Sequence, residues 1–129
     1  MAHHTILLVE DEPAVRELTA DILREEGYNV VEARDGLEAL QVIDEHVPFS
    51  EHAAVVLLDL MLPKVSGLQV LTHLRQSKDA ATPVVAMSAS GAHLSQAAMA
   101  GANATLAKPF DLGSLLDVIA RYCPPQSDE

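Results

Sequence analysis

Five short strand-like stretches alternate along the chain with five segments whose apolar residues recur at helical spacing. The strand-like stretches are residues 5–9, 29–33, 53–59, 83–87 and 104–107. Short apolar runs of this kind are typical of strands buried on both faces of a parallel sheet, with helices as the crossover connections. The alternation therefore predicts an α/β fold, a doubly wound (βα)5 five-stranded parallel sheet.

Local signals indicate where the helices begin and end. Pro13 suits the first position of a helix, and Gly27 suits the residue after its end. Asp35 and Asp111 are predicted to cap two further helices, while Glu12 is expected to act as a cap before Pro13. A short alanine-rich helix is expected over residues 94–100, after a loop from 88 to 93, and another loop over residues 46–52. The last helix is predicted to bury four residues and to end before Pro124 and Pro125, the four being Leu112, Leu115, Leu116 and Ile119.

Right-handed crossovers restrict the order of the strands. The expected order is 2-1-3-4-5, with the rather polar second strand at an edge and the first and third strands as central neighbours. Functional residues of such folds lie at the carboxyl ends of the strands. The whole chain, residues 1–129, is expected to be one domain, with residues 123–129 as a tail or the start of a linker.

The charge of the chain argues against two classes of partner. Nineteen acidic residues against eight basic ones give a net charge of −11. Direct binding to nucleic acids or to anionic membranes needs a basic surface, so neither is expected. There is no apolar run of 18 residues and no signal-peptide pattern near the start, which predicts a cytoplasmic location. Cys123 is the only cysteine, so no internal disulfide can form.

Charged and polar residues stand where four of the predicted strands end. Glu10 and Asp11 follow the first strand, Asp59 ends the third, Ser88 follows the fourth and Lys108 follows the fifth. In a parallel sheet these points share one edge. Like charges about 4 Å apart repel by about 4 kcal/mol at an effective dielectric near 20, so three carboxylates need compensation beyond one lysine. Oxygen ligands select Mg²⁺ rather than zinc, and such a site suits phosphate oxygens.

Four motifs carry a resemblance to a known family. The motifs LLVEDE, VVLLDLMLPKVSG, VVAMSAS and LAKPF occur in this order. Across residues 5–122 the chain resembles a CheY-like receiver domain, the response-regulator domain of the two-component signalling family. The resemblance implies a protein that accepts a phosphoryl group on itself and turns over no external substrate.

The resemblance also implies a role for each residue at the strand ends. Asp59 would accept the phosphoryl group from a sensor histidine kinase, a phosphotransfer protein or a small phosphodonor. Ser88 would hydrogen-bond the phosphoryl group and carry the switch, and Lys108 would pair with its oxygens. The expected Mg²⁺ ligands are Glu10, Asp11, Asp59 and the backbone carbonyl of Met61. The bond between Lys108 and Pro109 is expected to be cis.

The output of such a domain would pass through the surface formed by about residues 88–122, which would control a downstream protein target. The protein would be a monomer or a weak dimer that depends on phosphorylation. Family members usually carry an aromatic residue three positions before the lysine, but Thr105 stands there. Thr105 is therefore either a small switch residue or, as we favour, a strand residue at an edge of the sheet. The side chains of Met61 and Met87 are expected to pack inside.

Two other functional classes remain open on the sequence. A phosphatase of the haloacid-dehalogenase type also uses an aspartyl phosphate, but it would carry a second aspartate at position 61, where this chain has Met61. A phosphorylation-independent receiver-like module that only binds other proteins would keep the fold without the switch. Turnover of phosphate esters would identify the first class, and failure to accept a phosphoryl group would identify the second.

Overall fold

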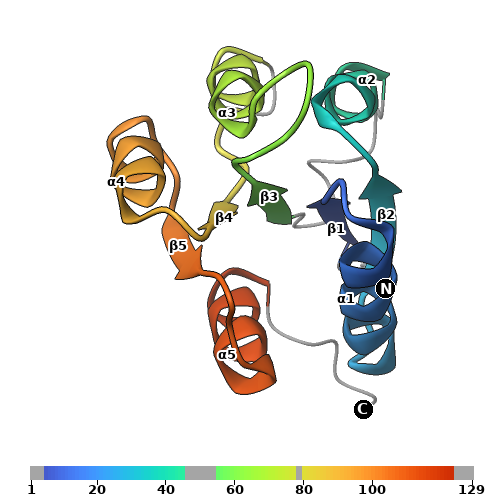
Figure 1. Ribbon diagram of the computed structural model, residues 1–129. Coiled ribbons are helices and arrows are strands. Elements are labelled where there is room, and N and C mark those ends of the chain that lie inside the picture. The colour runs from blue at the N-terminus through green and yellow to red at the C-terminus, as the bar shows by residue number, and fades with distance from the viewer. Residues whose placement is uncertain (1–4, 46–54, 78–79, 124–129) are drawn as a thin grey trace.

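The computed structural model describes residues 5–45, 55–77 and 80–123. Within these residues one parallel sheet has the strand order β2-β1-β3-β4-β5 (Figure 1). The strands are β1 Thr5–Val9, β2 Asn29–Ala33, β3 Val55–Asp59, β4 Val84–Ser88 and β5 Ala104–Ala107. The predicted fold class, the strand order and the edge position of the second strand are confirmed. The predicted loop 46–52, residues 53–54 of the predicted third strand and Pro124 and Pro125 lie outside the described residues.

A helix follows each strand of the described chain. The helices are α1 Pro13–Glu25, α2 Gly36–Glu45, α3 Gly67–Arg75, α4 Gly91–Met99 and α5 Leu112–Tyr122. Figure 1 shows α1 and α5 on one face of the sheet and α2, α3 and α4 on the other. None of these helices combines the length and the apolar character that crossing a bilayer requires.

Most of the predicted helix signals act as expected. The Asp35 carboxylate accepts a hydrogen bond from the Glu38 N–H at 2.9 Å, and the Asp111 carboxylate accepts one from the Ser114 N–H at 2.7 Å. Gly27 lies just beyond α1 with a φ of +98°, a backbone conformation that side chains with a Cβ rarely adopt. These contacts satisfy backbone groups that the helix ends leave unpaired.

Four expectations about individual residues were wrong. The helix α4 begins at Gly91 rather than at residue 94, because the Ser90 hydroxyl caps it by accepting a hydrogen bond from the His93 N–H at 3.3 Å. Glu12 occupies the position before α1, but its side chain makes no capping hydrogen bond. Leu112, the first residue of α5, and Met61, in the loop after β3, were expected to be buried but are 47% and 57% exposed, because each lines a surface hollow rather than the core.

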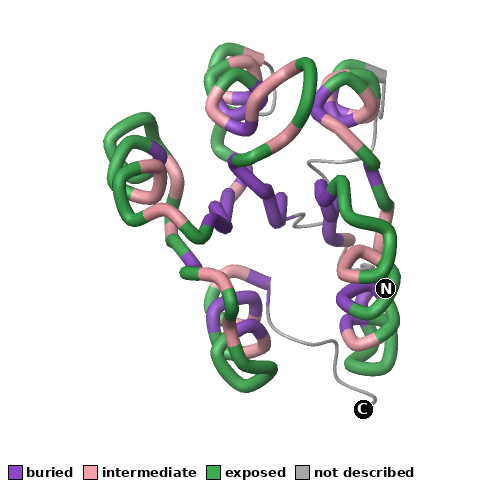
Figure 2. The backbone as a smooth tube through the Cα atoms, viewed as in Figure 1, coloured by how far each residue is buried: buried purple, intermediate pink, exposed green. Residues whose placement is uncertain are grey.

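The core is divided by the sheet into two layers of aliphatic side chains. Alternate residues of β1 and β3 point to opposite faces, as the pleat requires. Leu7 and Leu58 pack under α2, α3 and α4, whereas Leu8 and Leu57 pack under α1 and α5. Figure 2 shows β3 and β4 buried throughout and β1 buried after its first residue, with exposed residues on the outer sides of the helices. The central strands therefore hold whatever follows them in a fixed position.

Candidate functional site

The carboxyl ends of the central strands bring the predicted charged residues together. Glu10 and Asp11 directly follow β1, Asp59 is the last residue of β3, and Lys108 directly follows β5. Asp59 pairs in register with Met87, one residue before Ser88 at the end of β4. The sheet thus collects groups that lie up to 98 residues apart in the sequence. The predicted convergence at one edge of the sheet is what the structure shows.

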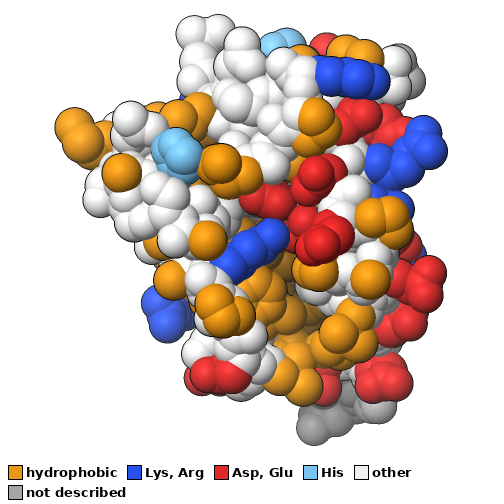
Figure 3. All heavy atoms as spheres, in the orientation of Figure 1, with side chains coloured by type: hydrophobic (Ala, Val, Ile, Leu, Met, Phe, Trp, Pro, Cys, Tyr) orange, Lys and Arg blue, Asp and Glu red, His pale blue; other side chains and the backbone are white. Residues whose placement is uncertain are grey.

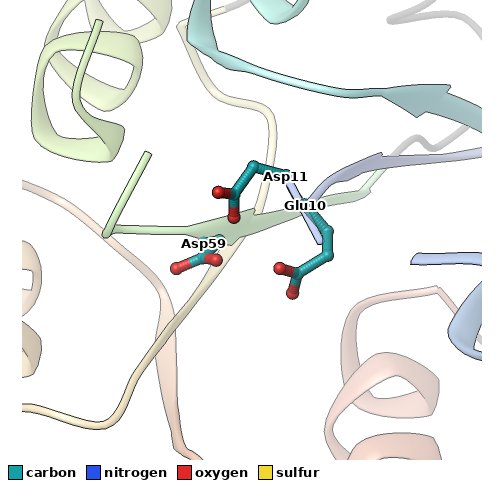
Figure 4. Close-up of side chains that lie close together, drawn as sticks. All are labelled: Glu10, Asp11 and Asp59. Carbon is teal, nitrogen blue, oxygen red and sulfur yellow. The ribbon is translucent and has the colours of Figure 1, made fainter. Parts of the chain in front are cut away.

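Three carboxylates form the centre of the site. Glu10, Asp11 and Asp59 each place one carboxylate oxygen so that the three oxygens lie within 4.8 Å of one another (Figure 4). Glu10 and Asp59 are buried, at 2% and 4% exposure, whereas Asp11 is exposed. The cluster is therefore closed towards the protein and open to solvent through Asp11.

Lys108 lies beside the two buried carboxylates. Its ammonium nitrogen Nζ donates hydrogen bonds to Glu10 Oε1 at 2.7 Å and to Asp59 Oδ2 at 3.2 Å. Burial opposes the charge of Lys108, but the hydrogen bond with Glu10 and the nearby charges of Asp59 and Glu10 outweigh it and raise the lysine pKa. Burial raises the pKa of Glu10, and the hydrogen bond from Lys108 only partly offsets this effect. One ammonium group thus serves two buried acids, which leaves the cluster short of positive charge.

Backbone contacts fix the carboxylate of Asp59. Asp59 Oδ1 accepts a hydrogen bond from the Met61 N–H at 2.9 Å, so the two carboxylate oxygens are held from different sides. Gly67 packs against the same strand end, since a Cβ there would lie 2.5 Å from the Asp59 carbonyl oxygen and 2.5 Å from the Leu60 Cα. Only glycine permits this close approach, which explains the glycine that begins α3.

Ser88 is fully buried at the end of β4 and links the site to α4. Its hydroxyl oxygen accepts a hydrogen bond from the Ser90 N–H at 3.0 Å, and Ser90 in turn caps α4. The Lys108 N–H donates to the Ser88 carbonyl at 2.9 Å, and the Lys108–Pro109 peptide bond is cis. Thr105 is exposed on β5. Among the described contacts, none joins Ser88 or Thr105 to Asp59.

Arg16 supports the site, although sequence reasoning did not single it out. Its guanidinium donates a hydrogen bond from Nη1 to the Glu10 backbone carbonyl at 2.9 Å, and its Nε lies 3.4 Å from the Glu32 carboxylate. Arg16 therefore holds the turn between β1 and α1 through the backbone. The sequence did contain a signal for Arg16: it is a basic residue in the first turn of a helix that follows an acidic cluster.

The residues present fit a hard divalent cation. The ligand atoms are carboxylate oxygens, their charges exceed that of the single ammonium group, and Asp11 leaves one side open to solvent. Figure 3 shows the red acidic side chains gathered at this edge of the sheet, above a hollow lined by hydrophobic side chains. The donor set matches Mg²⁺ rather than a metal that prefers sulfur or nitrogen ligands.

Comparison with known proteins gives the same picture. The family model of the response regulator receiver domain matches residues 6–120. Sporulation initiation phosphotransferase F of Bacillus subtilis is 30% identical over 130 residues, which cover 99% of this chain and 100% of that protein. The transcriptional regulatory protein CpxR of Escherichia coli is 37% identical over 108 residues, which cover 82% of this chain and 43% of CpxR. The chain thus spans less than half the length of CpxR.

Among solved structures, the receiver domain of a sensor histidine kinase from Pseudomonas aeruginosa, described with a magnesium ion coordinated in its active-site cleft, superposes with a TM-score of 0.81 at 28% identity. That superposition covers 94% of this chain and 98% of the other. The strand order, the acidic cluster with its lysine, and a family match over most of the length agree: this chain belongs to the response regulator receiver domains of two-component signalling systems.

Proposed function

We propose that the protein is a Mg²⁺-dependent switch that accepts a phosphoryl group on Asp59. The donor is the phosphohistidine of a sensor histidine kinase or phosphotransfer protein, or a small phosphodonor. One observation carries this proposal: the Asp59 carboxylate stands at the end of a fully buried strand, fixed by Met61 and Lys108, beside two further carboxylates. An aspartate held in this way can act as a nucleophile towards phosphorus.

Each neighbour of Asp59 has a defined part in this reaction. Lys108 is near enough to move from Asp59 Oδ2 to an oxygen of the incoming phosphoryl group, whose negative charge it stabilises. Glu10, Asp11, Asp59 and the Met61 carbonyl would hold Mg²⁺, which when bound neutralises charge on the phosphoryl oxygens. Phosphoryl transfer needs mostly positioning and charge neutralisation, which agrees with a site whose fixed groups are carboxylates and one ammonium.

Ser88 provides a route from the site to the output surface. A phosphoryl group on Asp59 would accept a hydrogen bond from the Ser88 hydroxyl, and drawing that hydroxyl towards the phosphoryl group would pull it from the Ser90 N–H, from which it accepts a hydrogen bond at 3.0 Å. Since Ser90 caps α4, a shift of Ser88 would alter the beginning of that helix. With Thr105 in place of an aromatic residue, this path through Ser90 would carry the signal to the surface of α4, β5 and α5. Met99, 90% exposed on α4, would belong to the contact with a downstream target.

The phosphoryl donor would dock over the hollow between α1 and α5. This cavity has a volume of about 490 Å³, and Val15, Leu18 and Ile22 of α1 face Phe110 and Leu112 across it. Lys108 lies in the same wall, so a protein seated in the hollow would reach the acceptor site. Leu18 is 63% exposed, as a docking residue would be.

The test is incubation with acetyl phosphate and Mg²⁺, followed by measurement of the intact mass. We expect a gain of one phosphoryl group that disappears in Asp59→Asn and when EDTA replaces Mg²⁺. A folded wild-type protein that gains no mass, from acetyl phosphate or from a phosphorylated histidine kinase, would overturn the proposal and favour the module that only binds other proteins.

A further inference from the structure

A second cavity lies beside the acceptor, between the β3–α3 loop and the first turns of α4. Its volume is about 480 Å³, and its wall includes Asp11, Met61, His93 and Gln96. The Met61 N–H holds Asp59 Oδ1 at 2.9 Å, and Asp11 belongs to the carboxylate cluster. The cavity therefore adjoins the place where a phosphodonor has to sit.

His93 stands out in this wall because its ring has no fixed partner. The ring nitrogen Nδ1 is buried, and the described residues offer it no hydrogen-bond partner. As the ring lies, Nδ1 is shielded from solvent and unpaired, so a rotation that turns it towards the cavity would let it form a hydrogen bond with a ligand there. The backbone of His93 is held by the Ser90 hydroxyl at 3.3 Å. The imidazole ring can therefore rotate while the backbone stays fixed, and no hydrogen bond of Nδ1 within the described residues is broken.

We infer that His93 determines which small phosphodonor the protein accepts, by donating a hydrogen bond to a carboxylate leaving group in this cavity. The inference rests on the proposed function of Asp59. The ligand class is a short acyl phosphate: its acyl oxygens accept hydrogen bonds, and its alkyl group contacts Met61. The Met61 side chain is 57% exposed, and its flexible thioether adapts to small apolar groups.

The group transfer balances without a proton donor. A carboxylate oxygen of Asp59 forms a bond to phosphorus while the bond from phosphorus to the acyl oxygen breaks. The electron pair of that broken bond leaves with the acyl oxygen as a carboxylate, so the total charge is unchanged. His93 stabilises this departing carboxylate through one imidazole N–H, and the acyl phosphate itself is the only co-reactant.

The test compares two donors that differ in their leaving group, acetyl phosphate and phosphoramidate. His93→Phe keeps a ring of similar shape without nitrogen, and His93→Asn restores an N–H donor. For His93→Phe we expect the second-order rate constant with acetyl phosphate to fall about 3- to 10-fold, as the loss of one hydrogen bond predicts, with little change for phosphoramidate. His93→Asn should recover part of the loss. The control is His73→Phe, which removes a histidine outside the cavity that lies 2.7 Å from Asp44.

Each outcome separates this inference from the proposed function. If wild-type protein accepts no phosphoryl group from any donor, the function of Asp59 fails and the inference falls with it. If Asp59 is phosphorylated but His93→Phe slows both donors equally, or neither, the role of His93 in donor choice is refuted while the proposed function stands. Urea unfolding of each variant shows whether a rate change reflects a damaged fold.

Discussion

Replacing Lys108 with methionine tests how the site balances its charges. The substitution removes the ammonium group and keeps a side chain of similar length. Lys108 Nζ lies 2.7 Å from Glu10 Oε1 and 3.2 Å from Asp59 Oδ2, and both acids are nearly completely buried. Without the lysine, two buried carboxylates face each other with no cation in the described structure between them.

The size of the effect follows from these distances. At about 3 Å and an effective dielectric near 20, each pair of unit charges attracts by about 5 kcal/mol, most of which offsets the cost of removing the charges from water. Removing one partner of a fully buried ion pair costs about 3–5 kcal/mol. The Lys108 side chain is 25% exposed, so water screens part of this interaction. We therefore expect the free energy of unfolding to fall by about 2–3 kcal/mol in the absence of Mg²⁺.

The assay is urea unfolding followed by circular dichroism, in EDTA and with saturating Mg²⁺. The loss in Lys108→Met should be smaller with Mg²⁺, because a cation bound to the carboxylates takes over their neutralisation. Lys64→Met is the matched control, since Lys64 is exposed on the β3–α3 loop, and it should change stability by less than about 0.5 kcal/mol. Equal losses in the two variants, or no loss for Lys108→Met in EDTA, would refute the reasoning.

Three further predictions concern stability. Gly67→Ala should lower the free energy of unfolding by about 1–3 kcal/mol in urea titrations, because its Cβ would lie 2.5 Å from backbone atoms of Asp59 and Leu60. Gly91→Ala, where nothing lies within 4 Å, is the control and should be nearly neutral. Tyr28→Phe removes a buried hydrogen bond of 2.6 Å to the Cys123 carbonyl and should cost about 1–2 kcal/mol in urea titrations. Burial raises the pKa of Tyr28 to about 12. A pH titration followed by ultraviolet absorbance should therefore show a late tyrosine ionisation in the wild-type protein that is absent from Tyr28→Phe. Burial raises the pKa of Glu10 in the folded state, so the folded protein binds this proton more tightly than the unfolded chain does. Glu10 therefore contributes stability at acid pH, and this contribution is lost as the pH rises above the usual glutamate pKa of about 4.3. In EDTA, the free energy of unfolding of Glu10→Gln should fall less steeply with rising pH than that of the wild-type protein. An unchanged slope would contradict this prediction.

The sequence was informative about Asp59 and Lys108 because their positions follow from the sheet alone. A polar residue directly after a buried run has to lie at the strand end, and parallel strands place all such ends at one edge. The convergence of Glu10, Asp11, Asp59 and Lys108 therefore needed no side-chain detail. The same argument placed Ser88 at that edge, and the structure shows it fully buried beside β3.

Other features depend on packing that no local pattern encodes. Leu112 has the spacing of a buried residue, yet it faces the hollow between α1 and α5 because that hollow separates the two helices. The Ser90 cap begins α4 three residues before the predicted start at residue 94, within a segment that the sequence predicts to be a loop. The burial of the unpartnered ring nitrogen of His93 depends on how the described residues pack around α4, which spacing along that helix does not reveal.

The bond between Lys108 and Glu10 joins residues 98 positions apart, and β5 is the last strand of the sheet. During synthesis from the amino terminus, the acids of β1 and β3 emerge long before the lysine that neutralises them. A nascent chain in which β5 has not yet docked holds these carboxylates without their ammonium group. The two ion pairs of Lys108 therefore tie the completion of the site to the docking of the last strand of the described sheet.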